Sequence, residues 1–192
     1  MKSLYTGLLA LSLFSASATA AHYVIDDDEK GAHAAVNFKI KHLGYSWLTG
    51  RFNRFEGHFN YEPGKLEDSS VKVTIDTTSV DSNHARRDKH LRGDDFLSVD
   101  KFPKATFISN RIETINEEEF KIHGKLTLHG VTKDVVIDAT KIGEGKDPWG
   151  GYRAGFTGTT ELALKDFGID YNLGPASTHV QLELHVEGIR QD

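Results

Sequence analysis

The sequence predicts an all-β fold of about eight antiparallel strands, arranged as a sandwich or barrel, with one modest helix. Residues 120–128 are apolar at every second position, and similar alternation returns in segment after segment. Because side chains on a strand point alternately to opposite faces, each such segment buries one face and leaves the other in water. Several segments run to about ten residues, longer than the usual five or six. Long strands favour a tall closed barrel, since closure removes the exposed edges.

The first two strands are expected at residues 22–25 and 33–43. The first is short and ends in the acidic run 26–29, which we interpret as a solvated turn. In the second, Val36, Phe38 and Ile40 fall on one face while lysines and an asparagine fall on the other.

Residues 47–61 are rich in aromatics and are interrupted by Gly50 and Gly57. This pattern indicates two strands, or one long strand bent at a bulge, rather than a helix. A Pro63-Gly64 turn follows, and residues 71–76 alternate again as a strand.

Alternation stops over residues 82–91, which predicts the single helix. Ser82 or Asn83 is the expected N-cap, and Gly93 marks the C-terminal end. Because this segment has few apolar residues, the helix must lie on the sheet or across an opening of it.

Five further strands are expected in the second half of the chain. Their predicted ranges are 105–113, 119–129, 133–142, 152–164 and 178–188. Glycine-rich loops separate them, notably residues 143–151.

The N-terminus predicts a secretory signal peptide over residues 1–20. Lys2 supplies the positive region, residues 4–14 the apolar region and Ala18-Thr19-Ala20 a small-residue cleavage site. An apolar first strand or helix of the fold is the alternative interpretation. Residues 21–192 are then one exported domain, and no later apolar stretch is long enough to span a membrane.

Composition excludes several classes of function. The chain has no cysteine, which rules out disulfides, cysteine catalysis and thiolate metal sites. Its net charge is −5, with Lys and Arg spread along the sequence, which argues against nucleic acid as a partner.

The sequence holds few signs of catalysis. It has no Gly-x-Ser-x-Gly element and no phosphate-binding loop of the P-loop type. His84 and Asp88 stand four apart on the predicted helix with His90 nearby, but this spacing is not a known metal signature, and exposed helix histidines are the simpler interpretation. We therefore expect no cofactor, no metal and no enzyme activity.

Two features could contact the polar head of a bound molecule. His42 extends the apolar face of its strand, where a polar group needs a partner, either a loop carbonyl or a ligand head group. Residues 86–96 are dense in both signs of charge, typical of a salt-bridged helix and its cap. The alternative is a lid beside a barrel mouth, with Arg86, Arg87 or Arg92 near an anionic head group.

Several stretches together resemble the YceI family of lipocalin-like periplasmic proteins. They are residues 33–44 (HAAVNFKIKHLG), 50–57, 88–96, 102–107, 124–133 (GKLTLHGVTK), 147–151 and 173–177, in the family's order. The resemblance covers essentially all of residues 21–192.

The resemblance implies an extended eight-stranded antiparallel, lipocalin-like barrel with a short helix near one end and an elongated apolar tunnel. In the family the tunnel holds a long isoprenoid, such as a polyprenyl lipid or quinone precursor, or another amphiphile. It also implies a periplasmic location and a functional link to a cytochrome b561-like membrane protein. The residues expected to line the tunnel are Val36, Phe38, Ile40, His42, Phe55, Phe59, Phe107, Ile122, Leu126, Phe156, Leu162, Leu182 and Leu184.

The leading hypothesis is a carrier or store for an isoprenoid or similar amphiphilic lipid, which binds without chemistry. One alternative is an enzyme acting on such a lipid through His42 or His90 with a carboxylate such as Asp88. Another is a stress or scaffold protein whose interior is packed solid.

Overall fold

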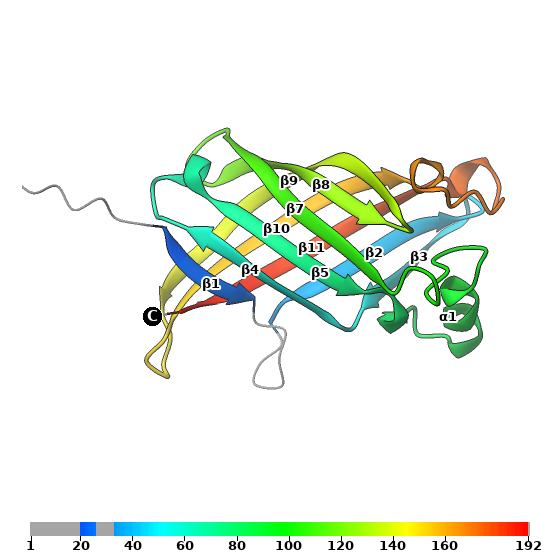
Figure 1. Ribbon diagram of the computed structural model, residues 1–192, viewed down its shortest axis with the longest axis horizontal. Coiled ribbons are helices and arrows are strands. Elements are labelled where there is room, and N and C mark those ends of the chain that lie inside the picture. The colour runs from blue at the N-terminus through cyan, green and yellow to red at the C-terminus, as the bar shows by residue number, and fades with distance from the viewer. Residues whose placement is uncertain (1–19, 26–32, 192) are drawn as a thin grey trace, which may run out of the picture.

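The computed structural model describes residues 20–25 and 33–191, which form an elongated antiparallel barrel (Figure 1). The signal peptide predicted at residues 1–20 lies, apart from its last residue, outside the described residues, as does the turn predicted at 26–29. The strands are β1 (Ala21–Ile25), β2 (Ala35–His42), β3 (Ser46–Phe52), β4 (Phe55–Tyr61), β5 (Ser70–Asp76), β6 (Val80–Asp81), β7 (Lys104–Thr114), β8 (Glu119–Leu128), β9 (Val131–Lys146), β10 (Tyr152–Ala163) and β11 (His179–Arg190). The helix is α1 (Ala85–Arg92), and 3-10 turns occur at η1 (Leu66–Asp68), η2 (Thr77–Ser79), η3 (Leu164–Phe167) and η4 (Pro175–Ser177).

Eight strands close the barrel in the order β1-β4-β5-β7-β8-β9-β10-β11, because β1 also pairs with β11. The predicted all-β, eight-stranded barrel with one short helix is confirmed. β1 and β2 share one edge of β11: β1 pairs with residues 188–190, and β2 with residues 180–185. The β2–β3 hairpin therefore extends the wall at the end that carries α1 (Figure 1).

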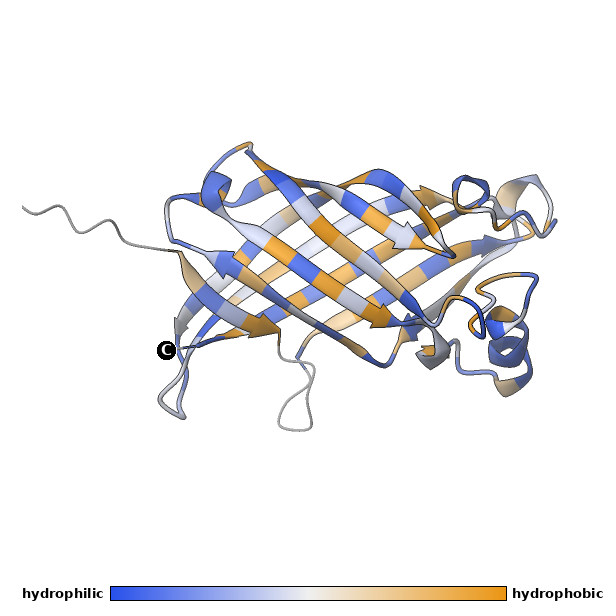
Figure 2. Cartoon of the chain, in the orientation of Figure 1, coloured by the Kyte–Doolittle hydropathy of each residue, from blue (hydrophilic) through white to orange (hydrophobic). Residues whose placement is uncertain are grey.

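The alternation that predicted the strands separates the interior from the surface. On β8, Phe120 and Leu126 are buried inside the barrel. Lys121 and Lys125 lie outside and form ion pairs with carboxylates of β9. Figure 2 shows the resulting alternation of hydrophobic and hydrophilic residues along the strands.

One loop differs from the prediction. Residues 143–146 were expected in a loop but continue β9, because they pair with the start of β10 and leave only residues 147–151 as the turn. Residues 47–61 form two strands separated at Asn53 and Arg54, the first of the two predicted alternatives.

The helix begins later than predicted, and its N-cap is His84 rather than Ser82 or Asn83. The Nδ1 atom of His84 accepts a hydrogen bond from the backbone N–H of Arg87 at 3.2 Å. Asn83 takes a left-handed backbone conformation with φ 61°, and Ser82 is engaged by Asp88. Gly93 follows the last helical residue, as predicted.

Helix α1 lies at one end of the barrel, beside the β2–β3 hairpin (Figure 1). Across residues 20–25 and 33–191, no helix has the length and apolar character that crossing a membrane requires.

Candidate functional site

Two adjoining cavities lie inside the barrel. The deep cavity has a volume of about 140 Å³ and lies among the inward faces of β4, β5, β7–β9 and the middle of β10 and β11. The mouth cavity has a volume of about 590 Å³ and lies between the β2–β3 hairpin and α1. Val36, Ile75, Leu126 and Leu182 line both cavities, so the two lie end to end along the interior of the barrel, which we term the tunnel.

The deep cavity is almost entirely apolar. No Asp, Glu, Lys or Arg is among the described residues that line it. The Ser69 hydroxyl is buried there without a hydrogen-bond partner in the described chain. Such a space can remove an alkyl or prenyl chain from water, but offers almost nothing to a charged group.

Aromatic rings close the deep cavity. Phe156 meets Phe59, Tyr61 and Phe120 edge to face, with ring centroids 5.5, 5.4 and 6.0 Å away. Tyr23 stacks on Phe59 at 4.8 Å. These five rings, which we term the aromatic plug, limit how far a chain can extend along the tunnel.

Charged groups lie behind the aromatic plug. Lys141 donates to Oε1 of Glu144 at 2.6 Å, and the Tyr61 hydroxyl donates to the same oxygen at 3.4 Å. Burial alone would lower the pKa of Lys141, but hydrogen bonds with Glu144 and Tyr61 outweigh it and raise that pKa. Burial raises the pKa of Tyr61. The lysine therefore stays charged outside the plug while the tunnel side stays apolar.

The mouth cavity combines an apolar floor with hydrogen-bond donors. Arg87 is the one permanently charged residue among its described lining residues, and no carboxylate is among them. Arg87 donates from Nε to the Ser82 hydroxyl at 2.6 Å and from Nη2 to the Ser82 carbonyl. The other N–H groups of its guanidinium have no hydrogen-bond partner in the described chain. The mouth therefore suits a head group that accepts hydrogen bonds or carries negative charge.

His42 and His90 also line the mouth. The His42 ring is exposed and has no hydrogen bond within the described residues, so the expected bond to a loop carbonyl is absent. The Nε2 atom of His90 lies 2.8 Å from Oδ2 of Asp95, and its ring meets Phe96 and Tyr171 edge to face.

Asp88 anchors the helix. It is 7% exposed, and Oδ1 accepts from the N–H and hydroxyl of Ser82 at 2.8 and 2.5 Å. Burial alone would raise the pKa of Asp88, but these hydrogen bonds outweigh it and lower that pKa. The hypothetical pair of His90 with Asp88 is therefore not formed. In the part of the chain that is described, no group of three or more His, Asp or Glu could hold a metal ion.

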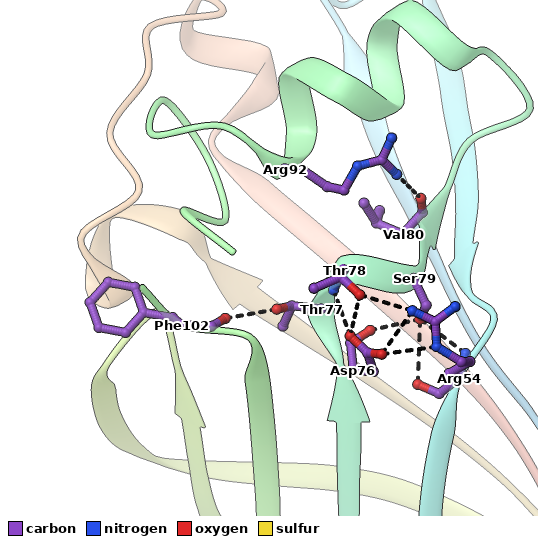
Figure 3. Close-up of polar contacts among 8 residues, drawn as sticks. All are labelled: Arg54, Asp76, Thr77, Thr78, Ser79, Val80, Arg92 and Phe102. Atoms are coloured by element: carbon purple, nitrogen blue, oxygen red, sulfur yellow. Dashed lines mark hydrogen bonds and ion pairs between the residues drawn. The ribbon is translucent and has the colours of Figure 1, made fainter. Parts of the chain in front are cut away.

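A polar latch of Arg54, Asp76 and Thr78 fixes the rim where β5 bends into η2 (Figure 3). Arg54 donates to Asp76 from Nε and to Thr78 Oγ1 from Nη2, both at 2.9 Å. Asp76 also accepts from the Thr78 N–H at 2.9 Å. Burial would raise the pKa of Asp76, but hydrogen bonds from Thr78 and Arg54 outweigh it and lower that pKa.

Two further bonds tie the segment carrying α1 to this rim (Figure 3). The Thr77 hydroxyl donates to the Phe102 carbonyl at 2.7 Å, and Arg92 donates to the Val80 carbonyl at 3.2 Å. Hydrogen bonds between β5, η2, Arg54 and the segment carrying α1 therefore hold the rim of the mouth in a defined position.

All of the residues predicted to line the tunnel lie against one cavity or both; that they contact a ligand stays a prediction. Phe55, Phe59, Phe107, Ile122, Phe156 and Leu184 line the deep cavity. Phe38, Ile40, His42 and Leu162 line the mouth, whereas Val36, Leu126 and Leu182 line both.

Sequence reasoning missed other lining residues. Val71, Val73 and Ile75 line the deep cavity, and their alternation was visible in the sequence. Phe96 and Leu173 line the mouth from loops, where no periodic pattern could have indicated them.

The family model described as a YceI-like domain matches residues 23–188. The chain belongs to the YceI-like family. Its curated relatives carry the family designation UPF0312. This YceI-like chain is 56% identical to a UPF0312 protein of Shewanella putrefaciens and 55% identical to one of Shewanella oneidensis, each over 99% of both chains.

Solved structures share the barrel of this YceI-like chain. The Campylobacter jejuni YceI protein matches with a TM-score of 0.73 and 32% identity, over 80% of this chain and 91% of that one. A polyisoprenoid binding domain from Saccharophagus degradans, implicated in plant cell wall breakdown, matches with a TM-score of 0.64 over 90% of this chain and 99% of that one. At 16% identity, that second likeness concerns the fold alone.

Proposed function

We propose that this chain is a periplasmic carrier or store for a long isoprenoid or similar amphiphilic lipid, which it binds without chemical change. The observation that carries the proposal is the pair of adjoining cavities inside the barrel, of which the deep one is lined by no Asp, Glu, Lys or Arg among the described residues. The ligand class is taken from the polyisoprenoid binding domain of Saccharophagus degradans, with which this chain shares its fold.

The energetics favour a long apolar tail. Removing apolar surface from water contributes about 25 cal/mol per Å², so a prenyl chain along the tunnel needs few polar contacts to bind tightly. The tail then ends at the aromatic plug, and the head group lies in the mouth near Arg87.

The observations weigh differently on the two alternatives. A solid interior is hard to reconcile with the two cavities. An enzyme that used His90 would have Asp95 rather than Asp88 as its carboxylate partner, because Asp88 is engaged by Ser82, and one that used His42 would find no carboxylate among the described residues lining the mouth. The proposed location depends on the leader predicted at residues 1–20, and the link to a cytochrome b561-like membrane protein stays a prediction.

Native mass spectrometry of protein purified from the periplasmic fraction, followed by organic extraction, tests the proposal. We expect the leader to be removed near Ala20 and the protein to carry a lipid whose mass matches an isoprenoid. Incubation with that lipid should return it unchanged.

Repeated preparations that hold no lipid and take none up in vitro would contradict the carrier. Conversion of the lipid to a product, lost in His90→Ala, would establish the enzyme instead. Recovery of the protein from the cytoplasm with its leader intact would overturn the proposed location.

A further inference from the structure

The tip of the β2–β3 hairpin exposes large apolar side chains beside the tunnel mouth. Leu43 is 47% exposed, Tyr45 87% and Trp47 48%. Trp47 also borders the mouth cavity. We call Leu43, Tyr45 and Trp47 the hairpin tip.

The hairpin tip is held rigidly in an unfavourable backbone conformation. Leu43 has φ 52°, in the left-handed region that side-chain-bearing residues rarely adopt. The buried Ser177 hydroxyl accepts from the Leu43 N–H at 3.2 Å and donates to the Lys41 carbonyl at 2.5 Å. The fold therefore fixes an apolar side chain outward at a turn where a glycine or asparagine would be less strained.

The same segment is strongly basic. Residues 33–55 hold Lys39, Lys41, Arg51 and Arg54 and no Asp or Glu, although the chain as a whole has a net charge of −5. Arg54 is paired with Asp76 and Arg51 lies opposite Asp81, so Lys39 and Lys41 supply the positive charge near the hairpin tip. The ammonium groups of Lys39 and Lys41 lie 5.4 and 5.7 Å from the Trp47 ring centroid.

The opposite rim of the mouth is also basic. Arg86 and Lys89 are exposed on α1. Two carboxylates of the loop that follows α1 are paired, Asp94 with Lys101 and Asp95 with His90, and Asp170 is exposed beside Tyr171. On β11, which pairs with β2, the facing carboxylate is Glu183, opposite Asn37 and 3.3 Å from His185.

This combination matches the interface of a bilayer that contains anionic lipids. Tyr and Trp favour the headgroup level, an exposed Leu can enter the acyl region, and lysines keep their charge in the headgroups while their stems lie along apolar surface. We propose that the hairpin tip, with Lys39 and Lys41, docks the tunnel mouth onto an anionic lipid surface. The inference concerns the outer surface, so it holds for an empty tunnel as well as a filled one.

The charge pattern favours a lipid surface over a second copy of this chain. A two-fold symmetric contact through this face would bring its lysines against the same lysines of the other copy, and like charges repel. A bilayer with anionic headgroups offers both a negative surface and an apolar layer.

The two tryptophans provide a test with a built-in control. Trp149 lies in the turn between β9 and β10, at the end of the barrel away from α1 (Figure 1), and is 78% exposed. Trp149→Phe leaves Trp47 as the reporter, and Trp47→Phe leaves Trp149. On vesicles of phosphatidylcholine with phosphatidylglycerol, we expect the emission of Trp47 to shift to shorter wavelength and to be quenched by brominated acyl chains. The emission wavelength and quenching of Trp149 should change little.

The lysines are tested by vesicle flotation. Lys39→Gln with Lys41→Gln should weaken partitioning onto these vesicles about 30-fold, because each lysine near an anionic surface contributes about fivefold. The control variant Lys72→Gln with Lys146→Gln removes the same amount of charge from the side and the far end of the barrel. It should change partitioning onto these vesicles less than about twofold.

Equal responses of both tryptophans, or equal partitioning onto vesicles of phosphatidylcholine alone, would overturn the inference. Absence of vesicle binding would overturn it as well. Self-association in sedimentation that is lost in the Lys39 and Lys41 variant would assign this face to a second copy instead. None of these outcomes bears on whether the tunnel holds a lipid.

Discussion

The two ends of the tunnel differ in what they can recognise. The deep cavity has no charged residue among its described lining and ends in the aromatic plug. The mouth has Arg87, two histidines and several hydroxyls, and its rim is fixed by hydrogen bonds (Figure 3).

This difference separates affinity from orientation. Burial of apolar surface in the deep cavity supplies a free energy that depends on chain length but little on chemical detail. The few donors at the mouth contribute less energy, but they determine which end of an amphiphile faces out. Mutations at the two ends should therefore change different properties.

Placing a charge in the deep cavity has the largest expected effect. Leu184→Asp puts a carboxylate without a partner against the apolar tail and should weaken lipid binding at least about 1,000-fold, or about 4 kcal/mol. Lipid loading, measured by mass spectrometry, checks this, with Leu184→Met as the volume-conserving control. Thermal unfolding of both variants separates a folded, empty protein from an unfolded one. Normal lipid loading of a folded Leu184→Asp protein would contradict the claim that the deep cavity supplies most of the binding free energy.

Shortening the aromatic plug should change chain-length preference. Phe156→Ala removes the ring that contacts Phe59, Tyr61 and Phe120, and should lower the free energy of unfolding by about 3 kcal/mol. The deeper tunnel should then favour prenols longer by one or more isoprene units. Competition within a series of prenols measures the preference, and Phe156→Leu should shift it less. An unchanged preference would mean that the plug is not the end of the chain's path.

Breaking the polar latch at the rim should destabilise the protein less than Phe156→Ala does. Asp76→Asn weakens the bonds to Thr78 and Arg54 and should lower the free energy of unfolding by about 1 kcal/mol at neutral pH. Because the pKa of Asp76 is lowered in the folded protein, this contribution is present above the unfolded pKa and is lost as pH falls below about 4. Denaturant unfolding across pH should show the variant and the wild type converging in acid. A difference that grows in acid would contradict the assigned sign.

The smallest effect is expected at His42. Its ring is exposed at the mouth and has no hydrogen bond in the described chain, so His42→Ala should change the affinity for an uncharged prenol less than about twofold. Fluorescence titration with a labelled prenol measures this. A tenfold loss would show that His42 contacts the ligand directly and that the mouth contributes more than orientation.

The sequence predicted most of the barrel because period-two alternation directly reports which face is buried. The alternation put Val36 and Phe38 on one face of β2 and Ile122 and Leu126 on one face of β8, and in the structure these side chains lie against the cavities. The two-residue strand β6 was missed because so short a segment has no period, and its pairing with Arg51 and Phe52 depends on tertiary structure. Residues 143–146 were mistaken for a loop because glycine is disfavoured in strands. Pairing with β10 overrode this low strand propensity.

The mouth was harder to predict than the deep cavity. Trp47, Arg87, Phe96 and Leu173 come from separate segments and meet only because the barrel closes. The helix cap was also misplaced, because Ser82 is bound by Asp88 and Arg87, six and five residues further along the chain, and these hydrogen bonds lie beyond the reach of local capping rules. Patterns within one strand therefore predicted the apolar faces that line the deep cavity, whereas the lining of the mouth depends on contacts between distant segments.

The central claim is that the tail of a bound amphiphile lies in the deep cavity and its head at the mouth. Two photoreactive prenols, one with a diazirine at the tail terminus and one with it at the head, test this by crosslinking followed by peptide mass spectrometry. We predict that the tail probe labels the peptides containing Phe120 and Phe156, and that the head probe labels those containing His42, Trp47 or Arg87. Labelling of the mouth by the tail probe, or of both ends equally by each probe, would contradict this account.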